Sequence, residues 1–93
     1  MKLVVLVVPR EVRDDAEAAL ESVGAFGFTE VPSVYGEGST GPRFGSRVAP
    51  GVCDLIFVAV QDATVGPVRA ALAAVETRLG RKLHAFVLPA EEI

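Results

Sequence analysis

The sequence predicts an α+β fold with four strands and two helices, and two observations carry that prediction. Residues 2–8 and 53–60 are apolar at nearly every position, Asp54 being the main exception, which is typical of strands buried on both faces of a sheet. Two other segments with strand character contain or precede a proline, Pro32 and Pro89. Because proline cannot donate a hydrogen bond to a central ladder, both segments are expected at sheet edges.

The first half of the chain is expected to form a strand, a helix and a second strand. Pro9 ends the first apolar run. Over residues 10–23 apolar side chains recur every three or four positions, the period of an amphipathic helix, and Gly24 supplies its C-terminal stop. Residues 28–35 then alternate in polarity and carry β-branched side chains, so they predict a strand.

The second half repeats this order after a long loop. Asp62 or Thr64 can cap a helix over residues 64–79, and Gly80 ends it. Residues 82–88 form the last strand. With the first and third strands central, the pattern selects a ferredoxin-like βαββαβ fold, whose antiparallel sheet has the order 4-1-3-2 and carries both helices on one face.

The opposite face of this sheet is predicted to be uncovered. The first strand is apolar at both parities, so the helices can cover only half of its apolar surface. Exposing the other half would leave a larger patch than a soluble monomer normally carries. The sequence therefore predicts that the chain associates with itself.

Composition restricts the classes of function. The 93 residues are expected to form a single domain, residues 1–93, and the net charge of −3 argues against binding nucleic acid. The lone cysteine, Cys53, fits a reducing compartment and a buried structural role, so we expect a cytoplasmic protein. The apolar run at the N-terminus is too short for a membrane span, so no transmembrane segment is expected.

The segment 35–51 is the predicted functional loop. Five of its seventeen residues are Gly and two are Pro. Loops longer than about 12–15 residues within a compact domain are usually either functional or disordered. Apolar side chains such as Phe44, and the two arginines Arg43 and Arg47, favour a loop that becomes ordered when it binds a ligand or partner.

Several groups in this loop could converge on an anion, because backbone amides, hydroxyls and guanidiniums all donate hydrogen bonds to one. The candidate ligand-binding residues are Gly36, Gly38, Ser39, Thr40, Arg43, Ser46 and Arg47. The alternative is that both arginines pair with acidic groups of a neighbouring subunit. The pattern Gly36-x-Gly38-x-x-Gly41 matches a dinucleotide fingerprint only formally, since Pro42 and the later proline and glycines prevent the helix that the fingerprint requires.

The remaining polar residues predict neither a metal site nor a catalytic set. His84 stands alone on a predicted strand, and no sequence spacing brings it to Cys53 or to the carboxylates Glu91 and Glu92. No nucleophile, base and orienting group form a set. The acidic residues of the first helix are expected to form a solvated face: Asp14, Asp15, Glu17 and Glu21.

Residues 24–29, Gly-Ala-Phe-Gly-Phe-Thr, and the following segment up to Gly38 resemble the PII signal-transduction proteins and their PII-like relatives. The resemblance is closest to the divergent PII-like group. That group has a loop of the form Gly-x-Gly-Ser, then Pro-Arg-hydrophobic-Gly-Ser/Thr, then Pro, which corresponds to residues 36–39, 42–46 and Pro50 here.

This resemblance implies a homotrimer with ligand clefts between subunits, and protein partners that respond to the loop, which the family calls the T-loop. In such an assembly we expect Leu6 and Phe57 to be buried. Residues 77–84 depart from the phosphate loop of true PII proteins, and the chain ends at Ile93 without their Arg-containing segment. The effector and any cofactor are therefore left unassigned.

The predicted function is that of a PII-like regulator, not an enzyme, which senses a small anionic effector at the subunit interface and signals to a partner protein. Two alternatives remain open at this stage. One is a small ferredoxin-like enzyme of the isomerase or monooxygenase kind. The other is a trimeric metal-tolerance protein resembling CutA, which would bind metal through His84 or Cys53.

Overall fold

The computed structural model describes residues 1–34, 37–38, 41–42 and 53–93. The elements, in chain order, are β1 (Lys2–Pro9), η1 (Arg10–Val12), α1 (Arg13–Ser22), β2 (Thr29–Val34), β3 (Glu37–Gly38), β4 (Gly41–Pro42), β5 (Cys53–Val60), η2 (Asp62–Thr64), α2 (Val65–Leu79) and β6 (His84–Pro89). Within these ranges, no helix has the length and apolar character that crossing a membrane requires.

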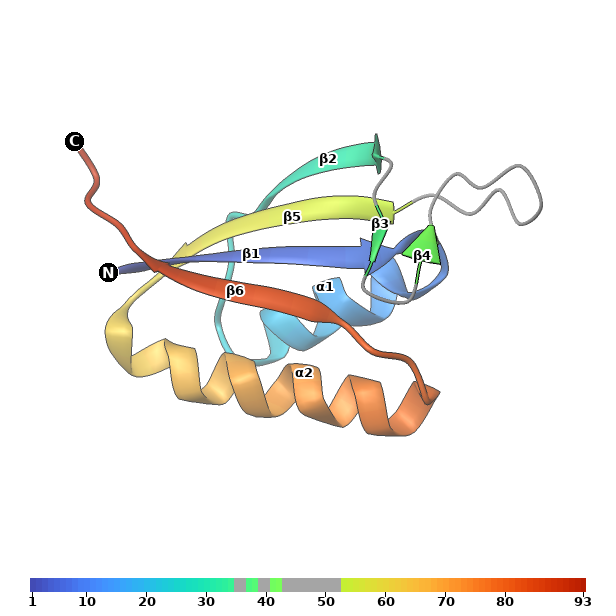
Figure 1. Cartoon of the computed structure of the whole chain (residues 1–93). Helices are drawn as coiled ribbons and strands as arrows, with labels where there is room; N and C mark the ends of the chain where they lie inside the picture. The colour runs from blue at the N-terminus through green and yellow to red at the C-terminus, as the bar shows by residue number, and fades with distance from the viewer. Residues whose placement is uncertain (35–36, 39–40, 43–52) are drawn as a thin grey trace.

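Four strands form one antiparallel sheet in the order β2-β5-β1-β6. Both helices lie on the same face of this sheet (Figure 1). Pro32 lies in β2 and Pro89 at the end of β6, so both prolines occupy edge strands, as predicted. The predicted ferredoxin-like fold and its strand order are confirmed.

The first helix is preceded by a 3-10 turn, η1, directly after Pro9, so the regular α-helix begins later than predicted. Its end is as predicted. Gly24 adopts a φ of 81°, and the N–H of Ala25 donates to the carbonyl of Leu20 at 2.9 Å. A left-handed glycine after the last turn is a common helix stop, because it lets the chain turn back without a Cβ clash.

The second helix lacks the predicted side-chain cap. Thr64 occupies the N-cap position but makes no capping hydrogen bond. The Asp62 carboxylate instead lies 2.8 Å from the amino terminus of Met1, so its charge is used to hold the start of the chain. At the other end Gly80 has a φ of 64° and closes the helix as predicted.

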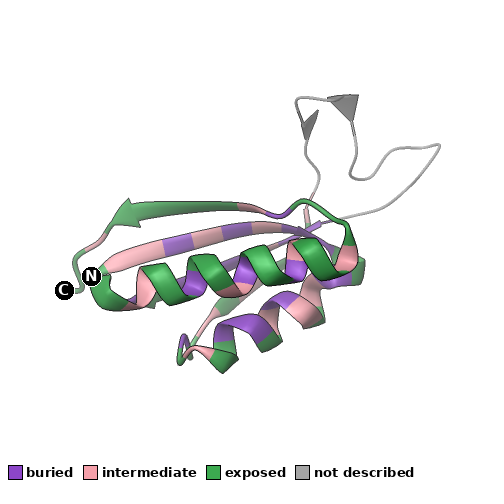
Figure 2. Ribbon diagram, turned by 90° about the horizontal axis from the view of Figure 1, so that it is seen from below, coloured by how far each residue is buried: buried purple, intermediate pink, exposed green. Residues whose placement is uncertain are grey.

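The core lies between the sheet and the helices, and Figure 2 shows the buried positions of both helices turned toward the strands. Strand β1 contributes Val4, Leu6 and Val8 to this core, and β5 contributes Ile56 beside Leu6. The side chain of Leu6 is 0% exposed. Leu6 is thus buried by the helices of its own chain and not by a subunit contact, whereas Phe57 projects from the opposite face.

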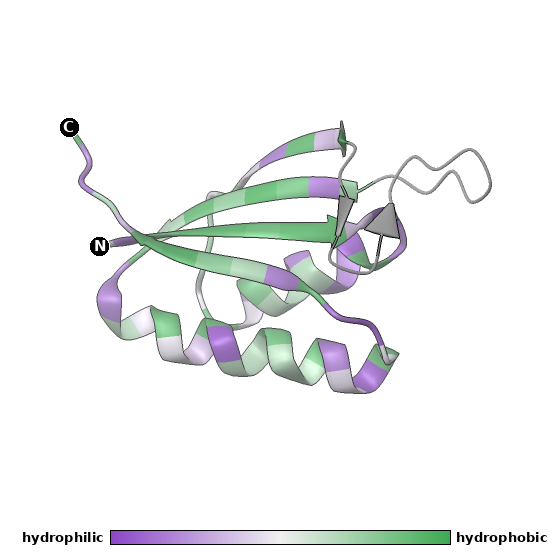
Figure 3. Cartoon of the chain, viewed as in Figure 1, coloured by the Kyte–Doolittle hydropathy of each residue, from purple (hydrophilic) through white to green (hydrophobic). Residues whose placement is uncertain are grey.

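The other face of the sheet, here called the open face, carries neither helix (Figure 1). Directly opposite residues share a face, and Val5 lies opposite both Phe57 and Phe86. The open face includes Leu3, Val5, Val7, Leu55, Phe57, Ala59, Phe86 and Leu88. Figure 3 shows the apolar character of these strands, and Phe86 is 57% exposed. The predicted uncovered apolar face is confirmed.

Candidate functional site

Most of the predicted ligand-binding residues lie outside the described residues. These are Gly36, Ser39, Thr40, Arg43, Ser46 and Arg47. Gly38 is described in its backbone only, where it pairs with Gly41 in the short β3–β4 hairpin. The predicted convergence of these groups on an anion therefore stays a prediction.

What the structure does describe is where the 35–52 segment leaves and rejoins the sheet, here called the loop root. Val34, the last residue of β2, pairs with Cys53, the first residue of β5. The two ends of the segment are thus adjacent in one ladder. The thiol of Cys53 also lies 3.5 Å from the carbonyl of Val34. Burial first, and then the charge of Asp54, raise the pKa of this thiol, which makes it a poor nucleophile or metal ligand.

Asp54 is the centre of the loop root. Its side chain is 0% exposed and lies on the helix side of the sheet, opposite Val8. One carboxylate oxygen accepts the Ser33 backbone N–H at 2.9 Å and faces Arg10 at 3.4 Å. The other accepts from Arg13 at 3.2 Å. A buried carboxylate is tolerated only when it is paired in this way.

The electrostatics of Asp54 follow from these contacts. Burial alone would raise the pKa of the carboxyl group, but the Ser33 N–H, the hydrogen bond from Arg10 and the charges of Arg10 and Arg13 outweigh it and lower the pKa. Asp54 is therefore ionised at neutral pH. Since both of its oxygens are occupied inside the core, it is a structural anion rather than an accessible acid or base.

Ser33 shows what this anion does to the backbone. Its φ is 60°, a left-handed value that residues other than glycine rarely adopt. The β2–β5 register shifts between Val31 and Val34, so the strand contains an irregularity at this point. Asp54 holds the Ser33 N–H, and Arg10 donates to the Ser33 hydroxyl. The direction in which the chain leaves β2 is thus tied to the buried ion pairs.

A second pair of acidic groups lies against the same arginine. Glu17 on α1 and Glu30 on β2 lie against the same guanidinium, and the nearness of Glu30 favours the protonated form of Glu17. The Arg13 Nε lies 3.7 Å from Glu17 and 3.9 Å from Glu30. The prediction that Glu17 belongs to a solvated face is wrong, because its side chain is only 23% exposed. Asp14, at 88%, does fit that prediction.

This carboxyl pair makes stability depend on pH. The hydrogen bond to Glu30, then burial and the Glu30 charge, raise the pKa of Glu17 from 4.5 to about 7. Between pH 4.5, the pKa in the unfolded chain, and about pH 7, the pKa in the folded chain, the folded chain binds more protons than the unfolded chain. The stabilisation is fully present below the unfolded-state pKa of Glu17 and is lost as the pH rises through its folded-state pKa.

We expect the wild type to lose about 1–2 kcal/mol of unfolding free energy between pH 5 and pH 8 from this pair, allowing for partial solvent screening. Urea unfolding at the two pH values measures the loss. Glu17→Gln should remove most of it, because the amide cannot titrate. Glu21→Gln, on an exposed part of the same helix, is the control. The same loss in all three proteins would contradict the assignment.

The alternative of a metal protein finds no cluster of metal ligands in the described part of the chain. In residues 1–34 and 53–93 no three or more His, Cys, Asp or Glu side chains gather in a way that could hold a metal ion. Near the loop root, Glu11 binds Arg81 at 2.8 Å, which ties the turn after α2 to η1. The ion pairs at and near the loop root therefore hold β5, η1, α1 and the turn after α2 together.

Sequence reasoning missed the contacts of the loop root, above all those of Asp54 and Glu17. The sequence does contain one indication of the role of Asp54, since it is the only charged residue in the apolar run of residues 53–60. A single acid inside a strand buried on both faces must have cationic partners. The sequence contains no comparable indication for Glu17, because its partner Glu30 lies on another element.

No protein-family model matches the chain, and no curated protein matches it in sequence. Solved structures do share its fold. CPII from Thiomonas intermedia K12, described as a nitrogen regulatory PII-like protein bound to ADP, AMP and bicarbonate, superposes with a TM-score of 0.76 at 23% identity, over 92% of this chain and 81% of that one. Its apo form superposes with a TM-score of 0.69 at 16% identity, over 94% and 87% of the two chains.

A DUF3240 family protein from Shewanella baltica OS155 superposes with a TM-score of 0.73 at 19% identity, over 99% of this chain and 91% of that one. These likenesses establish the fold. The resemblance to PII-like proteins that the sequence predicted is thus confirmed at the level of the fold.

Proposed function

We propose that the chain is a PII-like regulatory protein that binds a small anionic effector at a subunit interface and signals to a partner protein through its 35–51 loop. The observation that carries the proposal is the loop root. Both ends of the loop are held side by side in the sheet, and the exit from β2 is fixed by the buried Asp54. A loop anchored on a rigid frame can change its own conformation on binding without disturbing the core.

The class of effector is inferred from charge and from the neighbours. The loop carries Arg43 and Arg47 against a single acidic residue, Glu37, and guanidiniums bind carboxylate or phosphate in a bidentate way. Structures of CPII contain ADP, AMP, bicarbonate or acetate. Nucleotides, bicarbonate and small carboxylates are therefore the first effectors to test.

The proposed interface is the open face. An apolar sheet face with Phe86 at 57% and Leu88 at 46% exposure favours burial against copies of the same chain. We propose a homotrimer in which three such faces meet, and in which the loops lie near the boundaries between subunits. The protein acts as a binding protein and carries out no chemical step in this proposal.

The test of the proposed anion site is a comparison of the wild type with Arg43→Ala and Arg47→Ala. Charge-assisted hydrogen bonds contribute about 1.5–3 kcal/mol each, so each variant should bind an effector roughly tenfold more weakly or worse, while its assembly is unchanged. Calorimetric titration with nucleotides, bicarbonate and dicarboxylates measures the affinities. Arg78→Ala, which removes a cation from α2, is the matched control.

Equal affinities in all four proteins would remove both arginines from the effector site. The remaining explanation would be that they pair with acidic groups of a neighbouring subunit.

A further inference from the structure

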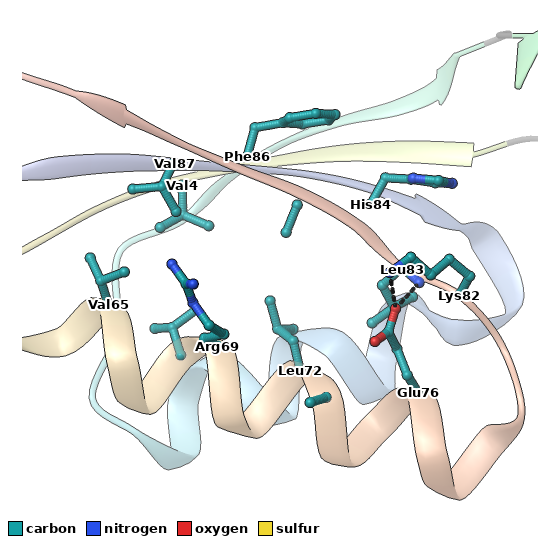
Figure 4. A pocket seen from close by; sticks show the side chains of 13 residues that line it. Val4, Val65, Arg69, Leu72, Glu76, Lys82, Leu83, His84, Phe86 and Val87 are labelled. Carbon is teal, nitrogen blue, oxygen red and sulfur yellow. Dashed lines mark hydrogen bonds and ion pairs between the residues drawn. The ribbon is translucent and has the colours of Figure 1, made fainter. Parts of the chain in front are cut away.

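A pocket of about 520 Å³ opens between α2 and β6, outside the loop root (Figure 4). This volume falls within the range of about 300–1,000 Å³ that is usual for small-molecule sites. Its apolar lining comes from β1, α2, β6 and the segment that leads into β6. Four of the lining residues are buried core side chains: Val4, Val68, Leu72 and Leu83.

Two of the side chains that line the pocket are small. Ala73 on α2 and Ala85 on β6 both line it, and neither fills the space between the helix and the strand. Strand β6 is an edge strand, so no further strand of the described sheet lies beside it. The pocket is thus open along the edge of the sheet and closed toward the core.

The charges around the pocket are unequal at its two ends. At one end the Glu76 carboxylate accepts the Leu83 N–H at 2.7 Å and faces the Lys82 ammonium at 3.5 Å, so this pair is neutral overall. At the other end Arg69 rises from α2 toward the strands (Figure 4). Among the described residues, no carboxylate lies within ion-pair distance of Arg69. The pocket therefore combines an apolar lining with an uncompensated cation.

We propose that this pocket binds a small carboxylate with an apolar body, such as a medium-chain fatty acid or an arylalkanoate. The apolar part would lie against Val4, Leu72 and Ala85, and the carboxylate would bind the Arg69 guanidinium. A guanidinium forms two parallel hydrogen bonds with a carboxylate, whereas an uncharged ligand of the same shape would gain only the apolar contacts. This site shares no residue with the loop.

The test uses octanoate as the probe and octan-1-ol as its uncharged counterpart, each titrated into the isotopically labelled full chain and followed by NMR. We expect octanoate to shift the amide signals of Leu72 and Ala85 and to bind at least roughly tenfold more tightly than octan-1-ol. Arg69→Gln should abolish that preference. Arg78→Gln, which removes the same charge from the same helix, should keep it.

A second pair of variants tests the position of the apolar body. Ala73→Phe places a ring in the pocket and should abolish binding of both probes. Ala74→Phe, an exposed position on the same helix that does not line the pocket, should leave binding unchanged. The proposal is overturned if octanoate does not bind, if its shifts fall on open-face residues that do not line the pocket, such as Phe57, or if Arg69→Gln and Arg78→Gln behave alike. The Arg43 and Arg47 variants should bind octanoate normally, which separates this site from the effector site.

Discussion

Asp54→Ala is expected to reduce the unfolding free energy by about 1.5–3 kcal/mol, because it removes the charged acceptor that Arg10 and Arg13 share. The Ser33 N–H would also lose its acceptor at the strained φ of 60°. Chemical denaturation at neutral pH measures the loss. Since a domain of this size is only marginally stable, Asp54→Asn provides a milder second variant, in which one acceptor oxygen remains.

The control for this experiment is Asp62→Ala, which removes an ion pair from a side chain that is 69% exposed. Exposed pairs contribute about 0–1 kcal/mol, so this variant should stay close to the wild type. If Asp54→Ala and Asp62→Ala lost equal stability, the anchoring role assigned to Asp54 would be wrong.

Phe57→Asp is expected to convert the proposed homotrimer into single chains of 9.8 kDa, because it would place an unpaired charge between packed open faces. Sedimentation measures the mass. Circular dichroism should show that the variant keeps its secondary structure, since Phe57 does not belong to the core. Leu6→Asp, whose side chain is 0% exposed among the core residues, should instead unfold the chain.

Ala74→Asp, on the exposed side of α2, should sediment like the wild type and serves as the control. A wild type that sediments as a stable monomer would contradict the proposed role of the open face. So would an unchanged mass for Phe57→Asp.

The sheet order was predictable because two independent signals agreed. Apolar residues at both parities placed β1 and β5 in the centre, and Pro32 and Pro89 marked the edges. Which face of β1 meets the helices was not predictable from the same pattern. Both faces are apolar, so the sequence did not show that Leu6 and Phe57 lie on opposite faces.

The loop root was less predictable, because its contacts join residues far apart in the sequence. Asp54 meets Arg10 across more than forty positions, and Glu17 meets Glu30 across two elements. Periodicity reports the face on which a residue lies but not its partner on another element. The pocket beside α2 has the same origin, since its lining joins residues of α2 and β6 that are distant in sequence.

Calorimetric titration of the wild-type protein with ADP, AMP and bicarbonate, at a concentration where sedimentation shows a homo-oligomer, tests whether this chain is an effector-binding regulator. Our proposal predicts saturable binding of at least one of these anions, weakened by Arg43→Ala or Arg47→Ala. Folded, assembled protein that binds none of the three would contradict it.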